Sequence, residues 1–447
     1  MPRRVLLVSL HHPELVRGGS QQICYELFRA LKSTDVEPIL LASAQFEMTP
    51  AVFKPGAIIT GFDGRENEFL FLSAFYDYEW HRNREFRRLE VFETFLRDVA
   101  PDVIHFHHFL SYGLEYLAAA RKYLNETGGR LVLTLHEFTA MCRADGQMAR
   151  TFDKSPCDRA SPVRCHQCFP DKSPEFFSLR TMWFKHHFRM VDTFVATSNF
   201  TLERYVEWGL PREKLLHIPA GHNLTAPPAV PASEGGPRKK RNRFAFFGQL
   251  IESKGLQVLF DAVRILRSAG FEDFGLDVFG ANLDFASEEF RDAFDDFWFE
   301  EEERRNGGVP RFRLHPRYEM ADLPRLMNDV DWVVVPSKWG ETFMMVISEA
   351  FLFGKPVICS NIGVMVERVR DGETGLHFVV GSSQSLAEAM TRALTEEGLW
   401  DRLHANIAPP PSAASSARRH LELCYQDGPD QREIAERALT ATDLAAD

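Results

Sequence analysis

Two glutamates lie eight positions apart between two strongly apolar runs of the sequence. Glu341 follows DWVVVPS at residues 331–337, and Glu349 precedes KPVICS at residues 355–360. The residues between them have a helical pattern, in which a spacing of about two turns places both carboxylates on one face. Because a carboxylate buried on a helix face needs a partner, this spacing suits a ligand rich in hydroxyl groups. An ordinary helix whose two acids form a cap and salt bridges is the alternative.

The elements that position these acids follow from apolar runs that alternate with helical patterns. This alternation extends over residues 1–223 and again over residues 243–405, which predicts two parallel sheets covered on both faces. Each segment is expected to be a Rossmann-like α/β domain, which binds ligands beyond the carboxyl ends of its strands. Residues 224–242, rich in proline and small residues, are expected to be an interdomain linker. Residues 406–447 are expected to be a partly helical tail, and the acidic stretch 286–308 a surface helix.

Size, charge and hydropathy limit the class of protein. The 447 residues, 45% of them hydrophobic, exceed the roughly 250 residues that one core usually serves, so two domains are the default. The net charge of −11 comes almost wholly from the second half, because residues 1–235 hold 27 basic and 28 acidic residues. A nucleic-acid partner requires a basic face, so none is expected.

No apolar run reaches the roughly 18 residues of a membrane span and no cleavable leader precedes the first strand, so a cytoplasmic protein is expected.

An ordered series of motifs surrounds the two glutamates. In sequence order it comprises PSKWGE (336–341), Glu349-Ala350, GKPVI (354–358), Ile362-Gly363, Glu367 and DGETG (371–375). This series resembles the donor-site signature of glycosyltransferase family 4, whose members are retaining enzymes of GT-B architecture, with two Rossmann-like domains facing across a central cleft. Further matches are FFGQLIESKG (246–255), HHPELVRGGSQQ (11–22), DVIHFHH (102–108), LTLHE (133–137) and ATSNF (196–200). The resemblance covers all but the C-terminal tail, whose chain crosses back to the first domain in this family.

The resemblance assigns roles to three charged residues. It implies that Glu349 holds the ribose hydroxyls of a nucleotide and that Glu341, as a catalytic residue, binds a hydroxyl of the transferred hexose. Lys254, also catalytic, supplies the positive charge that stabilises the departing nucleoside diphosphate. No catalytic metal is expected, because the family works without one and no Asp-x-Asp element ends a predicted strand.

The remaining donor-side residues include two departures from the family pattern. Gly248 and Gln249 form the glycine loop, in which the family usually has arginine where this chain has Gln249. An amide donates hydrogen bonds but does not neutralise phosphate, so more of that work is expected to fall to a lysine. The backbone N–H groups of Phe343 and Met344 are expected at a helix N-terminus beside the sugar or the diphosphate. The family favours glycine at the position of Met344, which allows a closer approach of the backbone.

The acceptor side is expected in the first domain. Gly18 and Gly19 precede a helix and, by the resemblance, contribute to the donor and acceptor sites, whereas a plain tight turn is the alternative. His107 ends a predicted strand, and the resemblance places it near the reacting sugar as a catalytic candidate. His136 and Glu137 end the next strand and are similar candidates. For each histidine a satisfied core residue is the alternative.

Four cysteines are concentrated in one polar segment after LTLHE. Cys142, Cys157, Cys165 and Cys168 have the spacing C-x14-C-x7-C-x2-C within residues 142–168. Disulfides are disfavoured in a cytoplasmic chain, whereas four thiolates with a C-x2-C pair suit tetrahedral Zn²⁺. A structural zinc site that shapes the acceptor pocket is the expectation. Unliganded thiols and iron–sulfur or redox use are the alternatives.

The next segment, SLRTMWFKHHFRM at residues 178–190, mixes aromatic and basic residues at helical spacing. An amphipathic helix of this kind suits peripheral contact with the inner face of a membrane, where lipid-linked acceptors are found. A helix packed on the sheet, with its cations in solvent, is the alternative.

Together these features predict a retaining hexosyltransferase. The expected donor is a UDP- or GDP-linked sugar, and the expected acceptor is a hydroxyl of a glycan or a lipid-linked molecule. The family favours a role in exopolysaccharide or cell-envelope glycan synthesis. Two alternatives stay open: a nucleotide-sugar-binding or scaffolding subunit with weak catalysis, and a GT-B sugar phosphorylase or epimerase.

Overall fold

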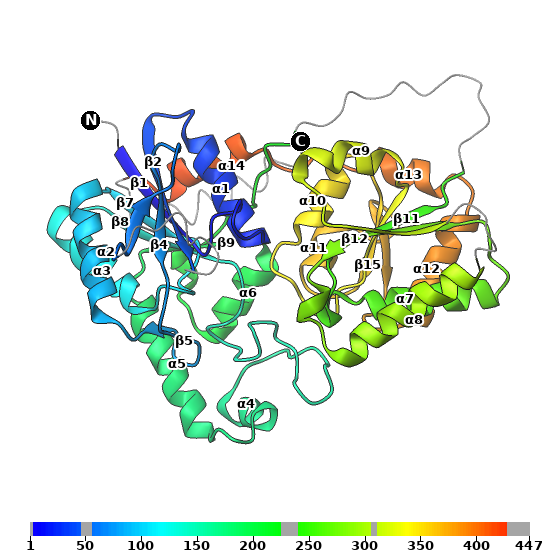
Figure 1. Cartoon of the computed structure of the whole chain (residues 1–447), viewed down its shortest axis with the longest axis horizontal. Coiled ribbons are helices and arrows are strands. Elements are labelled where there is room, and N and C mark those ends of the chain that lie inside the picture. Colours follow the sequence, from blue (N-terminus) through cyan, green and yellow to red (C-terminus); the bar gives the residue numbers. More distant parts are fainter. Residues whose placement is uncertain (1–2, 46–55, 225–239, 305–310, 427–447) are drawn as a thin grey trace. The chain divides into compact units, whose positions relative to one another are not determined.

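The computed structural model describes residues 3–45, 56–224, 240–304 and 311–426 (Figure 1). The chain divides into two compact units, of which one is Met1–Asn223 with Pro411–Asp447 and the other is Leu224–Pro410. Most of the predicted linker, the end of the acidic stretch and the helix expected near residues 431–444 lie outside the described residues. No helix in the described part of the chain is long and apolar enough to cross a membrane.

The described residues of the first unit form an eight-stranded sheet in the order β10-β9-β8-β7-β1-β2-β4-β3. All neighbouring strands are parallel except β3, which runs antiparallel to β4. The order reverses between β1 and β7, so the loops that follow these two strands leave the sheet side by side. The strands are β1 (Arg3–Ser9), β2 (Val36–Ala44), β3 (Ile59–Gly61), β4 (Glu68–Leu72), β7 (Val103–Phe106), β8 (Arg130–Leu135), β9 (Thr193–Ala196) and β10 (Leu215–His217).

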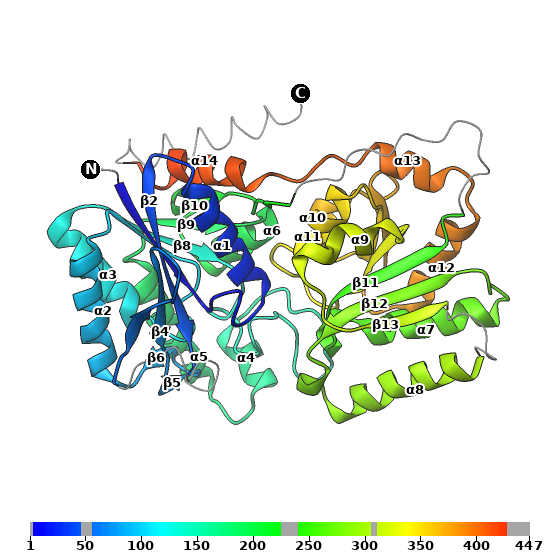
Figure 2. The same cartoon turned by 45° about the horizontal axis from the view of Figure 1, so that its top comes forward.

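Helices cover both faces of this sheet. On one face α1 (Gly19–Leu31) and α14 (Ala413–Leu423) lie side by side, and their apolar residues pack on β1, β7 and β8 (Figure 2). On the other face α2 (Phe86–Val99), α3 (Glu115–Thr127) and α5 (Pro174–Phe188) pack through aromatic pairs such as Phe92 with Phe106 and Phe188 with Phe194. The unit also contains α4 (Pro162–Cys168), α6 (Asn199–Trp208) and a small hairpin of β5 (Tyr76–Asp77) and β6 (Arg82–Asn83).

The second unit has a six-stranded parallel sheet in the order β13-β12-β11-β14-β15-β16. Its order reverses between β11 and β14, which places the loops after these strands next to each other. The strands are β11 (Arg243–Gln249), β12 (Gly275–Ala281), β13 (Phe312–His315), β14 (Trp332–Val335), β15 (Val357–Ser360) and β16 (Gly375–Phe378). The sheet confirms the predicted alternation of strands and helices.

Two layers of helices bury the faces of the second sheet. One layer contains α7 (Leu256–Ser268), α8 (Glu288–Arg304) and α12 (Ser383–Thr395), whose phenylalanines and leucines form a single core with Trp332 of β14. The opposite layer contains α9 (Leu323–Asn328), α10 (Met345–Leu352) and α11 (Val364–Arg368). After α13 (Leu399–Ala405) the chain returns to the first unit at Pro411. Both units are thus Rossmann-like α/β sandwiches, as the sequence predicted.

Candidate active site

The loops at the reversal point of the second sheet bring two predicted residues, Lys254 and Glu341, into contact. Lys254 lies in a short 3-10 helix after β11, and its Nζ is 2.7 Å from Oε1 of Glu341, which lies in the loop after β14. Ser337 donates a hydrogen bond of 2.7 Å from Oγ to the same carboxylate oxygen. Glu341 is only 5% exposed, so this ion pair is largely shielded from solvent. In such a pair the ammonium group can attract an incoming phosphate, and the carboxylate can accept a hydrogen bond from a sugar hydroxyl.

A glycine makes this approach of the two loops possible. Gly255, directly after Lys254, has a φ of 75°, and a Cβ placed on it would collide with the backbone carbonyl of Pro336. Any side chain at this position would therefore push the β11 loop away from the β14 loop.

Glu349 has a different environment. It lies on α10, is 5% exposed, and its Oε2 has no hydrogen-bond partner among the residues that the structure describes. Burial raises its pKa to about 7, although the nearby Arg368 opposes this shift. The interpretation of both acids as ordinary caps and salt bridges therefore fails for Glu349, which is a buried acceptor without a donor.

The relation between the two glutamates differs from the sequence expectation. Glu341 lies four residues before the start of α10 and has a left-handed φ of 47°, so the two carboxylates do not share a helix face. The helix begins only after a second left-handed residue, Met344, at φ 59° and ψ 79°. Sequence periodicity did not reveal this turn, because neither residue is a glycine.

Arg368 stabilises this turn through hydrogen bonds, and it was not among the residues predicted from the sequence. Its Nη1 donates to the backbone carbonyls of Phe343, at 2.6 Å, and Met344, at 2.9 Å, and its Nη2 donates to Oγ of Ser348. The guanidinium also stacks over the Phe343 ring, with the two groups 4.1 Å apart. Burial lowers the pKa of Arg368 to about 10. A signal was present in the sequence, since an arginine follows Glu367 inside an otherwise apolar helix, but its carbonyl partners lie on a distant segment.

The glycine loop is the remaining donor-side element. Gly248 and Gln249 are the last residues of β11, at its carboxyl end. The Gln249 side chain is exposed.

In the first unit two predicted histidines, one buried and one partly exposed, form a hydrogen-bonded pair. His107 Nδ1 and His136 Nε2 are 3.0 Å apart, so one ring donates to the other. Burial lowers the pKa of both rings, that of His136 to about 3, and both are therefore neutral. His107 is 2% exposed and lines a small cavity closed by α1 and α14, and in the described part of the chain its Nε2 has no hydrogen-bond partner. In the ligand-free protein this histidine thus belongs to the interior.

Glu137 and the glycine pair have more modest local roles. Thr139 donates its backbone N–H to Oε2 of Glu137, and burial raises the pKa of this carboxyl to about 7. Gly18 is the N-cap of α1 in an extended conformation at φ −168°, and Gly19 begins the helix. The backbone at Gly18 is therefore not strained, and the space that a Cβ would occupy is filled by the Gln21 side chain.

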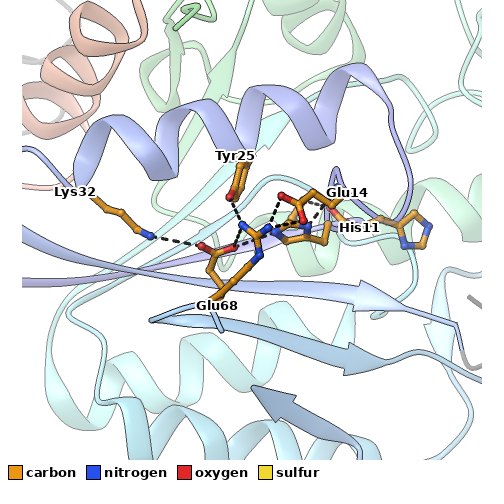
Figure 3. Close-up of polar contacts among 8 residues, drawn as sticks. His11, Glu14, Tyr25, Lys32 and Glu68 are labelled. Atoms are coloured by element: carbon orange, nitrogen blue, oxygen red, sulfur yellow. Dashed lines mark hydrogen bonds and ion pairs between the residues drawn. The ribbon is translucent and has the colours of Figure 1, made fainter. Parts of the chain in front are cut away.

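A polar network that was not predicted from the sequence fixes the loop between β1 and α1 (Figure 3). Glu68, 4% exposed on β4, pairs with His12 at 3.0 Å and with Lys32 at 3.4 Å. Arg65 is 3.9 Å from Glu68 and donates to the Tyr25 hydroxyl at 3.1 Å. A second contact of Arg65, with Glu14, ties the loop itself to this network. The loop that leads to Gly18 is thereby anchored to both α1 and β4.

The four clustered cysteines are all free thiols. Cys165 and Cys168 lie on α4, and Cys142, Cys157 and Cys168 are near enough to Cys165 to add to the rise in its pKa, which burial dominates. In the described ranges no group of three or more His, Cys, Asp or Glu side chains is arranged to hold a metal ion. The zinc site stays a prediction.

Comparison with known proteins agrees with this architecture. Residues 17–226 match the family described as Glycosyltransferase Family 4, and residues 232–408 match the family described as Glycosyl transferases group 1. A phosphatidyl-myo-inositol mannosyltransferase of Mycobacterium leprae is 28% identical over 191 residues, which are 42% of this chain. Those residues span 46% of the mannosyltransferase, less than half of its length.

Solved structures share the fold over nearly the whole chain. HepE of Anabaena, in complex with UDP and glucose, superposes with a TM-score of 0.59 at 16% identity, covering 99% of this chain and 100% of that one. A glycosyltransferase of Rickettsia africae superposes with a TM-score of 0.62 at 16% identity, covering 97% and 99%. Both family matches, the two Rossmann-like units and these neighbours lead to one conclusion: the chain belongs to glycosyltransferase family 4 and has the GT-B fold.

Proposed function

We propose that the protein transfers a hexose from a UDP- or GDP-linked sugar to a hydroxyl of a glycan or lipid-linked acceptor, with retention of configuration. The observation that carries the proposal is Glu349, a buried carboxylate whose Oε2 lacks a partner at the reversal point of the second sheet. Ribose hydroxyls would supply the missing donors. The mannosyltransferase among the relatives and the UDP and glucose bound to the structural neighbour support a nucleotide-sugar donor.

The other residues of the site take complementary roles in this proposal. Glu341 accepts a hydrogen bond from a hydroxyl of the hexose, and its ion pair with Lys254 keeps the ammonium in place. Lys254 then stabilises the negative charge that develops on the departing diphosphate, without a catalytic metal. The N–H groups that precede α10 add a favourable dipole for the anion. The leaving phosphate oxygen takes the acceptor proton, so no side chain is assigned as an obligatory base.

The test is the release of nucleoside diphosphate from a panel of UDP- and GDP-sugars. We expect one donor to be consumed, with loss of turnover in Glu349→Ala and unchanged turnover in Glu388→Ala, which removes an exposed glutamate of α12. Retention is checked from the anomeric configuration of the product, and metal independence from turnover in the presence of a chelator. Donor binding without release in the presence of candidate acceptors would favour a binding or scaffolding subunit. Phosphate-dependent turnover or donor epimerisation would favour the phosphorylase or epimerase alternatives.

A further inference from the structure

Exposed apolar side chains of the first unit are concentrated at one end of it. In its described part, every large apolar residue that is more than half exposed lies in residues 75–86 or 152–182. These residues are Phe75, Tyr78, Phe86, Phe152, Val163, Leu179 and Met182. Exposed apolar side chains scattered over a surface need no explanation, but a concentration in two segments does.

The two segments pack against each other. Trp183 of α5 donates from its indole nitrogen to the backbone carbonyl of Trp80, at 2.8 Å, in the β5–β6 hairpin. Arg180 of α5 donates to the neighbouring carbonyl of Glu79, at 3.3 Å. Lys172, just before α5, pairs with the Glu79 carboxylate at 2.9 Å. Both views show β5 beside α5 (Figures 1 and 2). The hairpin, α5 and the cysteine-rich loop thus form a single structure, which we call the hairpin–α5 end (residues 75–86 and 142–189).

The hairpin–α5 end is basic although the chain is acidic. Residues 75–86 and 142–189 together contain eleven lysines and arginines against eight aspartates and glutamates, in a chain of net charge −11. Within this segment Lys154, Arg159 and Arg189 are exposed and form no ion pair with a carboxylate in the described part of the chain. The hairpin carboxylates are neutralised locally, because Asp77 pairs with Arg82 and Arg84, and Glu79 with Lys172 and Arg143.

Helix α5 presents apolar and basic residues on the same outer face. Leu179, Met182, His186 and Arg189 are exposed at spacings of three and four residues, which places them along one side of the helix. The opposite side, with Phe177, Phe184 and Phe188, is buried in the unit. The alternative given for this segment, a helix packed on the sheet with its cations in solvent, agrees with this arrangement, except that Arg180 is buried.

We propose that the hairpin–α5 end binds the surface of an anionic lipid bilayer. Its leucine, methionine and aromatic side chains enter the interfacial region, and the unpaired lysines and arginines attract the negative headgroups. A second copy of the chain fits less well, because two basic ends would then face each other. This inference goes beyond the proposed transfer reaction and does not depend on it.

The experiment measures sedimentation of the full chain with vesicles of phosphatidylcholine alone and with vesicles of equal parts phosphatidylcholine and phosphatidylglycerol. We expect binding to the anionic vesicles only, weakened by salt. Replacing Lys154 and Arg189 by glutamate should reduce the partition coefficient by at least about tenfold. The double variant Leu179→Asp/Met182→Asp should reduce it by a similar factor. The matched control Phe285→Asp/Phe299→Asp changes two exposed apolar residues of the second unit and should bind like the unmodified protein.

Several results would overturn the proposal. Equal binding to neutral and anionic vesicles, no binding to either, or equal losses in the α5 and control variants would each contradict it. Loss of a dimer in Leu179→Asp/Met182→Asp, without any vesicle binding by the unmodified protein, would identify a second copy as the occupant. Because all six substituted side chains are exposed, the thermal unfolding of the variants should match that of the unmodified protein.

Discussion

Glu341 and Glu349 show how two carboxylates of similar burial acquire different chemistry. Glu341 forms an ion pair with Lys254, which the neighbouring β11 loop brings to it, and accepts a hydrogen bond from Ser337 of its own loop. No donor among the described residues contacts Oε2 of Glu349, and burial is the main cause of the raised pKa of this carboxyl. A group of this kind destabilises the ligand-free protein and is relieved by a ligand, which is typical of a binding site rather than of a structural pair.

The first prediction concerns stability without ligand. The pKa of Glu349 is raised from its ordinary value of 4.5 to about 7, so the folded state holds this proton more tightly than the unfolded state. The stabilisation is therefore complete below the ordinary value and is lost as the pH rises through about 7. Glu349→Gln, which mimics the protonated form, should be more stable than the unmodified protein by about 3 kcal/mol near pH 8 and equal to it near pH 4. Urea unfolding of both proteins across this range tests it, and parallel pH profiles would contradict the assignment.

The second prediction concerns the donor and depends on the proposed function. Ribose hydroxyls donate stronger hydrogen bonds to the ionised carboxylate than to the protonated group, so binding should favour deprotonation of Glu349. We expect donor affinity to rise with pH through about 7 and to change up to about tenfold per pH unit below that value. Calorimetry in buffers of different ionisation enthalpy should detect the released proton. Glu349→Gln should bind more weakly and release none, whereas an unchanged proton count in this variant would assign the linkage to another group.

At the scale of elements, the decisive feature is the strained turn that begins α10. Met344 adopts a left-handed conformation that costs a non-glycine residue about 1 kcal/mol or more. Arg368 of α11 offsets this cost by hydrogen-bonding the two carbonyls that the turn leaves exposed to the interior. Arg368 contacts the strained residue directly, although the two lie on different segments. Substitutions at the two positions should therefore be energetically coupled.

A double-mutant cycle tests this coupling. Met344→Gly should stabilise the protein by roughly 1 kcal/mol, because glycine adopts the left-handed conformation without strain. Arg368→Met leaves two buried carbonyls without donors and should destabilise it by about 2–4 kcal/mol. In the Arg368→Met background the turn relaxes, so the gain from Met344→Gly should shrink by at least about 0.5 kcal/mol. Strict additivity in urea unfolding would show that Arg368 supports the fold without holding the turn.

The same turn shows where the sequence was sufficient and where it was not. Alternating apolar runs predicted the strands and both Rossmann-like units, because each strand is buried on two faces and leaves a continuous signal. The order of motifs identified Glu341 and Glu349. Arg368 and Glu68 were missed, because each acts on groups far away in the chain, and such contacts have no period or spacing to detect. The left-handed backbone at Met344 had one signal, the glycine that the family favours at this position, but that glycine was interpreted as allowing a closer approach of the backbone to the ligand.

At the scale of the whole molecule, the chain leaves the first unit after Asn223 and returns to it at Pro411. The returning segment completes the core of that unit: Ala417, Cys424 and Tyr425 are almost fully buried against α1 and the sheet. The Tyr425 hydroxyl is 2.7 Å from Nδ1 of His105 on β7. The first unit therefore cannot finish folding until the C-terminal segment has been made, whereas the second unit is continuous in sequence.

The last prediction follows from this connectivity. Tyr425→Ala removes a large buried ring and should destabilise the first unit by about 3–5 kcal/mol, a large fraction of the usual stability of a domain. Tyr425→Phe removes only the hydroxyl that faces His105 and should cost about 1 kcal/mol. Hydrogen exchange should show faster exchange in β1, β7 and β8 of Tyr425→Ala and native protection in β11 and β14. The reciprocal control, Leu403→Ala, removes a fully buried leucine of the second unit and should produce the opposite pattern. Equal loss of protection in both units with either variant would mean that the two units unfold as one.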